Sequence, residues 1–152
     1  MTPFDMALEH AEDLAEAGDF AGALAALEST RLSEAAEGRA TNAAAAQVEV
    51  GAMTARAGDL EGALPVLELA EASARAAGAP LTALEARVTH CSVLGALAQF
   101  DRALPALKHA VAELESIAPG SELHQQAAGE LRSFTNLTSP KNAATWASLL
   151  ET

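Results

Sequence analysis

The sequence is poor in cysteine, in aromatic residues and in positive charge. Its 152 residues include one cysteine, one tryptophan and no tyrosine, and 9 lysines and arginines stand against 21 aspartates and glutamates, a net charge of −12. A single cysteine excludes an internal disulfide and is typical of a reducing compartment. A surface this acidic repels phosphate backbones, so we expect no nucleic-acid partner.

Long apolar runs are missing as well. Acidic residues interrupt the first segment at Asp5, Glu9, Glu12 and Asp13. No stretch comes near the run of about 18 apolar residues that indicates a membrane span. We therefore expect neither a secretion signal nor a membrane span, and a cytoplasmic location.

The chain is instead rich in alanine, which makes up about a quarter of it, and 50% of its residues are hydrophobic. Alanine is the best helix former, and the residues that interrupt helices are few, with 10 glycines and 6 prolines. The composition therefore predicts an all-α fold, and the length is that of one domain with a sizeable core.

A segment recurs three times along the chain, at residues 17–30, 57–70 and 97–110, with an offset of 40 residues each time. Repetition at a fixed period is the signature of a repeat architecture. The apolar residues that fall in register are predicted to form the core of each repeat: Phe20, Leu24 and Leu27; Leu60, Leu64 and Leu67; Phe100, Leu104 and Leu107.

Each recurring segment has the pattern of a helix hairpin. Gly18 and Gly58 stand where a helix ends in a left-handed residue, and Asp19 and Asp59 are suited to cap the helix that follows. The third copy has Ala98-Gln99 at these positions, which weakens its turn signal. The sequence predicts hairpins over about 4–38, 41–78 and 80–118, so that the repeat region occupies residues 1–120.

This unit resembles the tetratricopeptide repeat, in which a small residue in the first helix, a Gly-Asp-aromatic turn and an Ala-Leu pair recur. Ala11, Gly51 and Cys91 match the small position of the first helix, and Ala70 and Ala110 match that of the second. The period is 40 residues rather than 34, as in the longer-repeat variety found in bacterial regulators and adaptor proteins. The resemblance covers residues 4–118 and implies a right-handed helix-hairpin solenoid of three repeats.

Residues 121–152 do not repeat and are predicted to form a helical cap or tail. A helix beginning at Ser121 has an apolar face suited to cover the last repeat. A second helix opens near residue 139 and gathers Trp146, Leu149 and Leu150. These three residues either pack on the stack or dock on a partner, and the pattern leaves both open.

The resemblance also implies a concave groove lined by the first helix of each repeat. The groove residues that it predicts are Asp5, Leu8 and Glu12; Val48, Ala52 and Arg56; Glu85, Val88 and Ser92. Among them Leu8, Val48 and Val88 would form an apolar stripe, and only Arg56 is basic, so the basic set that grips a peptide carboxylate in the chaperone-adaptor branch is missing. We expect the groove to bind an apolar or amphipathic segment with basic flanks, unless it is shallow and empty or filled by the chain's own tail.

No pattern of catalytic or metal-binding residues is found. The four histidines, His10, His90, His109 and His124, have no metal-ligand spacing with one another or with Cys91. Cys91 occupies a position expected to be buried, which suits a structural thiol rather than a nucleophile. We therefore expect no enzyme activity, no metal and no cofactor.

The sequence favours a non-enzymatic interaction module, such as an adaptor, a chaperone or a regulatory subunit, that binds a protein or peptide. One alternative is a structural module that assembles with itself, as a homodimer for instance, through the last repeat or Trp146. Another is a small acidic secretion-type chaperone, although those usually have 34-residue repeats. A transcription factor would need a basic recognition helix, which is missing here.

Overall fold

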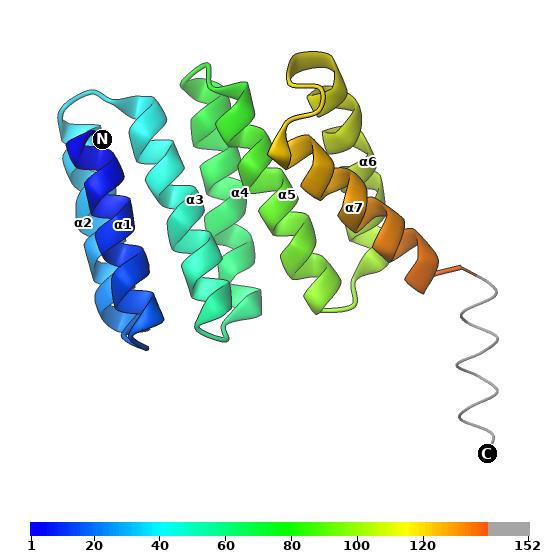
Figure 1. The fold of residues 1–152 in the computed structure, drawn as a ribbon, viewed down its shortest axis with the longest axis horizontal. Helices are drawn as coiled ribbons and strands as arrows, with labels where there is room; N and C mark the ends of the chain where they lie inside the picture. The colour runs from blue at the N-terminus through cyan, green and yellow to red at the C-terminus, as the bar shows by residue number, and fades with distance from the viewer. Residues whose placement is uncertain (140–152) are drawn as a thin grey trace.

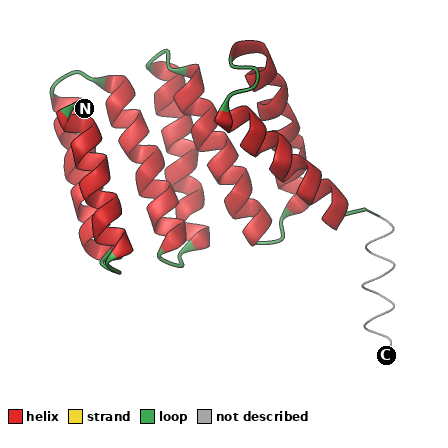
Figure 2. Cartoon of the chain, in the orientation of Figure 1, coloured by secondary structure: helices red, strands yellow, loops and turns green. Residues whose placement is uncertain are grey.

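The computed structural model describes residues 1–139, and in this part of the chain every regular element is a helix (Figures 1 and 2). The helices are α1 (Pro3–Glu16), α2 (Phe20–Ala36), α3 (Ala40–Arg56), α4 (Leu60–Ala76), α5 (Pro80–Ala96), α6 (Phe100–Ile117) and α7 (Glu122–Leu137). None of these described helices is long and apolar enough to cross a bilayer. Trp146, Leu149 and Leu150, predicted as a docking element, lie outside the described residues.

The helices form three hairpins, α1–α2, α3–α4 and α5–α6, that stand side by side along the molecule (Figure 1). Each helix packs on the next one in the chain, and α1, α3, α5 and α7 also contact each other in turn. Within residues 1–139, no such contacts join α2 to α4 or α4 to α6. The layer whose helices touch is therefore the inner, concave side of a helical repeat solenoid, which confirms the all-α repeat fold predicted from the sequence.

The five connections between α1 and α6 are the same three-residue turn. Its middle residue has a positive φ each time, at Gly18, Gly38, Gly58, Gly78 and Ala98. In each turn the last residue donates its N–H to a carbonyl five positions back, a Schellman arrangement that satisfies the end of the helix. Helices α2 to α5 are each 17 residues long, so one helix and one turn make 20 residues, half of the observed period.

In the first turn a single residue closes one helix and opens the next. The N–H of Asp19 bonds to the carbonyl of Leu14 at 2.9 Å, and its carboxylate accepts the N–H of Gly22 at 2.8 Å. Asp59 repeats this arrangement with Gly62. The Gly-Asp signal of the sequence thus has a physical cause, since glycine adopts the left-handed conformation and aspartate satisfies the free N–H groups of the next helix.

The third hairpin forms its turn without these residues. Ala98 takes a φ of +59°, and Gln99 makes no side-chain hydrogen bond to the start of α6. A left-handed conformation costs a residue with a Cβ roughly 1–2 kcal/mol. The weaker turn signal therefore corresponds to a strained turn, not to a missing one.

Replacing Ala98 by glycine should stabilise the protein by about 0.5–1 kcal/mol, because the strain is removed while glycine adds flexibility to the unfolded chain. Urea unfolding followed by circular dichroism measures the change. Gly58→Ala is the matched control: its Cβ would meet nothing within 4 Å, so only the positive φ opposes it, and it should destabilise. A loss of stability in Ala98→Gly would contradict this account of the turn.

The centre of each hairpin is a leucine packed against a small residue of the preceding helix. Leu27, Leu67 and Leu107 are almost completely buried. A Cβ on Gly51 would lie 2.5 Å from Cγ of Leu67, so α3 and α4 approach as closely as they do because residue 51 has no side chain.

The predicted core has three buried members, Leu27, Leu67 and Leu107. Six of its members are only partly buried: Phe20, Leu24, Leu60, Leu64, Phe100 and Leu104. Phe20 and Leu60 pack against the buried clusters of their own hairpins, and the ring of Phe100 packs against the ring of Phe134 on α7. These side chains lie at the rim of the hairpin, where part of each meets water.

The difference in burial predicts a difference in stability between neighbouring leucines of α4. Leu67→Ala should cost roughly 2–5 kcal/mol, whereas Leu64→Ala should cost less than half as much, because part of its side chain already meets water. Both are measured by urea unfolding of the purified variants. Equal losses of unfolding free energy in the two variants would show that the partial exposure of Leu64 does not reduce its contribution to stability.

Helix α7 covers the end of the stack. Its Ala127 is fully buried, and the ring of Phe134 meets that of Phe100 edge-on with the centroids 5.3 Å apart. A Cβ on Gly95 would lie only 2.3 Å from Cζ of Phe134, so this ring fits into the place of a missing side chain on α5. The helix predicted to begin at Ser121 does so, with the Ser121 hydroxyl capping its first turn.

Candidate functional site

Two adjoining hollows lie on the concave layer, between α3, α5 and α7. We call the first the acidic hollow; it measures about 260 Å³ and is lined by Val48, Glu49, Ala52, Glu85, Thr89, Glu122, Leu123 and Gln126. We call the second the apolar hollow; it measures about 390 Å³ and is lined by Ala52, Ala55, Arg56, Leu60, Thr89, Ser92, Val93, Ala96 and Gln126. Ala52, Thr89 and Gln126 belong to both, so the two hollows form one continuous groove.

Helical geometry explains which residues line this groove. On α5 the lining residues follow the spacing 85, 89, 92 and 96, which places them on one face of the helix. On α3 the corresponding face carries Glu49, Ala52 and Arg56. Helix α7 supplies the third wall from its first two turns.

The acidic hollow brings three carboxylates together without a cation among its lining residues. Burial, and then the charges of Glu85 and Glu12, raise the pKa of Glu49, with Arg56 acting in the opposite direction. Glu85 is exposed at the surface of the hollow, but the surrounding protein still removes part of its hydration, and this desolvation raises the pKa of its carboxyl group. A cation entering this hollow would relieve both costs.

Arg56, the one basic residue of the groove, is already paired. Its Nη1 lies 2.7 Å from Oε2 of Glu12 on α1, and this hydrogen bond lowers the pKa of the Glu12 carboxyl. The pair joins the first two hairpins at the end of the apolar hollow. Glu12 does not line either hollow itself, but its contact with Arg56 places it at the edge of the groove.

Five of the nine predicted groove residues line the groove: Val48, Ala52, Arg56, Glu85 and Ser92. Leu8 is partly buried against the core of the first hairpin. Asp5 caps α1, where its carboxylate accepts the backbone N–H of Thr2 at 3.0 Å, and it lines a separate hollow beside the start of that helix. Whether any of these residues contacts a partner stays a prediction.

The position predicted for Val88 is wrong. Val88 is completely buried in a cluster with Leu84 and Leu107, so it belongs to the core and no apolar stripe runs through Leu8, Val48 and Val88. Its neighbour Thr89, turned by about 100° around the helix, faces the groove instead. The spacing from Glu85 to Ser92 did not separate the two, since positions 88 and 89 lie equally far on either side of a helix face through those residues.

The residues of α7 in the groove were missed for another reason. Glu122, Leu123 and Gln126 line the hollows because α7 packs beside α5 as a fourth inner helix. The tail does not repeat the hairpin pattern, so its sequence alone did not place it in the concave layer.

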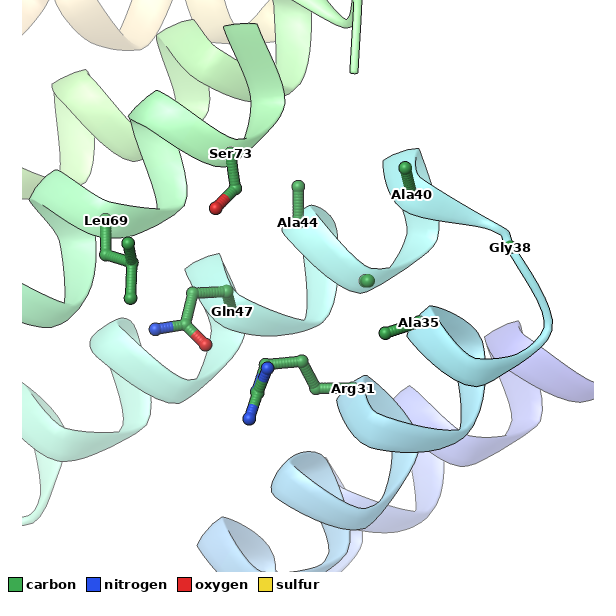
Figure 3. Close-up of a pocket in the computed structure, with 9 residues that line it drawn as sticks. Arg31, Ala35, Gly38, Ala40, Ala44, Gln47, Leu69 and Ser73 are labelled. Atoms are coloured by element: carbon green, nitrogen blue, oxygen red, sulfur yellow. The ribbon is translucent and has the colours of Figure 1, made fainter. Parts of the chain in front are cut away.

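A further hollow of about 300 Å³ lies on the opposite side, between α2, α3 and α4 (Figure 3). It exists because α2 and α4 do not contact each other, and α3 supplies a floor of small residues that includes Ala40, Ala43 and Ala44. Arg31 reaches toward this space but is paired with Glu28 (Figure 3). The residues that line this hollow include no carboxylate and no converging set of polar groups, so the concave groove is the better candidate site.

The groups with catalytic or metal-binding chemistry are dispersed. Within residues 1–139, no three of the His, Cys, Asp and Glu side chains gather closely enough to hold a metal ion. His90 lies 3.2 Å from Glu68, and His124 accepts the N–H of Gly120 at 3.0 Å, so each has a local structural partner. Cys91 is fully buried, and burial raises the pKa of its thiol to about 11.

Cys91 should therefore resist thiol reagents in the native protein. We expect the reaction with an aromatic disulfide reagent to be slow, without the rise between pH 8 and 9 that an exposed thiol of pKa about 8.5 would show. Absorbance of the released thiolate measures the rate, and the urea-unfolded protein is the control. Rapid native reaction would show that Cys91 is accessible.

Comparisons with protein-family models, with curated proteins and with solved structures found no match. The likeness to tetratricopeptide repeats thus rests on the residues of the chain itself, and function has to be argued from the groove.

Proposed function

We propose that the chain is a non-enzymatic interaction module, of the adaptor, chaperone or regulatory-subunit kind, that binds an amphipathic protein segment in the concave groove. The observation that carries this proposal is the union of the two hollows, one acidic without a lining cation and one apolar. A segment with a lysine or arginine beside an apolar side chain complements both.

The acidic hollow supports a basic side chain as its occupant. Glu49 and Glu85 keep carboxylates whose pKa burial has already raised, so an ammonium or guanidinium group would stabilise their charged forms. Outside the hollow, the carboxylates Glu12, Glu28 and Glu113 each have an arginine partner. A partner would thus supply the cation that residues 1–139 do not place among the lining of this hollow.

The apolar hollow supports a hydrophobic side chain next to that cation. Ala52, Ala55 and Ala96 give it a shallow floor, and Leu60 and Val93 give it apolar walls. Burying an apolar side chain here gains about 0.8 kcal/mol for each methylene group removed from water. A helix presents side chains three and four residues apart on one face, which suits two neighbouring hollows.

The wider features of the chain agree with such a role. The likeness to longer tetratricopeptide repeats favours a regulator or adaptor, and the net charge of −12 favours the approach of a basic partner. A cytoplasmic location suits a chain whose one cysteine is a buried thiol.

The groove can be tested with a designed probe. A fluorescein-labelled amphipathic peptide of leucine, lysine and alanine, about five helical turns long, should bind the wild type, and a version with glutamate for every lysine should not. Ala52→Arg puts bulk and a positive charge between the two hollows, so it should weaken binding of the lysine peptide at least tenfold, or about 1.4 kcal/mol. Fluorescence anisotropy measures both.

Ala43→Arg is the matched control. Ala43 lies on the same helix and is also partly buried, but it lines the hollow on the opposite side, so the same substitution should leave the affinity unchanged. Circular dichroism confirms that both variants fold. Equal affinities of the two variants, or equal affinities of the two peptides, would refute the concave groove as the binding surface.

A further inference from the structure

Glu130 of α7 is partly buried, and its carboxyl group faces α5. The hydroxyl of Ser92 on α5 lies within hydrogen-bond distance of Oε1, while Oε2 is buried and has no hydrogen-bond partner among the described residues. A buried charge with one unpaired oxygen is costly, whereas the neutral acid leaves only an uncharged oxygen unpaired.

The surroundings of Ser92 favour the neutral acid. The Ser92 hydroxyl also lies 3.1 Å from the carbonyl of Val88, and its single hydrogen can be donated to only one of these two acceptors. When Glu130 is protonated, its O–H can donate to Ser92 while Ser92 donates to Val88. Protonation thus completes a chain of hydrogen bonds from Glu130 through Ser92 to Val88. The ionised carboxylate instead competes with the carbonyl of Val88 for the hydroxyl hydrogen of Ser92.

No charge on the neighbouring helices compensates an ionised Glu130. On α5, Arg87 is held by Glu71 at 2.7 Å and Cys91 is a neutral thiol. On α6, Glu113 is paired with Arg75, and Lys108 and His109 point into solvent. On α7 itself, Arg132 is exposed and His124 bonds to Gly120. Burial accordingly raises the pKa of Glu130, with the Ser92 hydrogen bond acting in the opposite direction.

The contact matters because α7 is held on the stack mostly by side chains that are only partly buried. Ala127 is the one fully buried residue of this helix, and Leu123, Leu131 and Phe134 pack against the core cluster of the last hairpin. The same helix places Glu122, Leu123 and Gln126 in the acidic hollow. Release of α7 would therefore remove one wall of the groove.

We propose that Glu130 is a proton-controlled latch: its protonation fastens α7 against α5, and its ionisation loosens α7 and opens the groove on that side. The latch itself rests on the contacts of Glu130, whereas its effect on binding rests on the proposed function. The docked carboxyl has the higher pKa, so docking strengthens as the pH falls through that value. The gain is complete below the ordinary glutamate pKa of about 4.3.

Hydrogen exchange of the full-length protein tests the latch. Protection of the α7 amides, corrected for intrinsic rates and compared with those of α3, should fall as the pH is raised from about 4, near the ordinary glutamate pKa, to about 8. The fall approaches tenfold for each unit by which the docked and released pKa values differ. Glu130→Gln and Glu130→Leu cannot titrate, so α7 should stay protected at both ends of this range; the leucine variant also removes the polar group altogether. Glu115→Gln, which removes an exposed carboxylate of α6, should behave as the wild type.

Two results would overturn the latch: α7 protection in the wild type that does not change with pH relative to α3, or the wild-type pH dependence persisting in both Glu130 variants. The lysine probe peptide, measured at the same pH values, separates the two proposals. If α7 protection depends on pH but the peptide does not bind, the latch is supported and the groove function is refuted. Peptide binding with pH-independent protection supports the groove and refutes the latch.

Discussion

The rest of the structure depends on one local constraint, the turn in which a single residue ends one helix and begins the next. The residue after the left-handed position is also the N-cap of the following helix, so three residues suffice for each connection, and Asp19 and Asp59 add a side-chain hydrogen bond there that Arg39, Ala79 and Gln99 do not. Helices α2 to α5 have the same length. Equal helices joined by equal turns lie flush with one another. The stack is therefore a consequence of turn chemistry repeated five times, including once, at Ala98, against the conformational preference of the residue.

Packing then decides which side of the stack becomes a groove. Small residues such as Gly51 let consecutive helices approach closely, and the backbones of the inner helices α1, α3, α5 and α7 come closer to one another than those of α2, α4 and α6, although Arg75 of α4 still reaches Glu113 of α6. A stack whose two layers are spaced differently must curve toward the closer layer. The concave groove and the alanine-floored hollow on the other side thus have the same origin, one formed where helices converge and the other where they separate.

The repeat in the sequence was sufficient to predict the hairpins, because glycine, aspartate and leucine at fixed offsets act locally. Finer placement depended on rotation about helix axes, which the family likeness could not supply: Val88 proved buried and Thr89 exposed to the groove, one residue apart. Burial within a hairpin was also beyond the pattern, since Leu64 and Leu67 are equally apolar and only packing separates them. The position of α7 required long-range contacts, such as Phe134 over Gly95, that no local signal carries.

The distribution of charge separates two kinds of acid in this protein. Five arginines bind acidic partners along the outer faces and rims of the stack: Arg31, Arg39, Arg56, Arg75 and Arg87. Glu49, Glu85 and Glu130 lie on the inner side, and burial raises the pKa of each. Their ionisation opposes folding at neutral pH, so stability contributed by these groups increases as pH falls through their raised pKa values. Protons or cations that reach these carboxyl groups lower the cost of burying them, so the proposed basic segment would act on Glu49 and Glu85 in the same direction as protonation acts on Glu130.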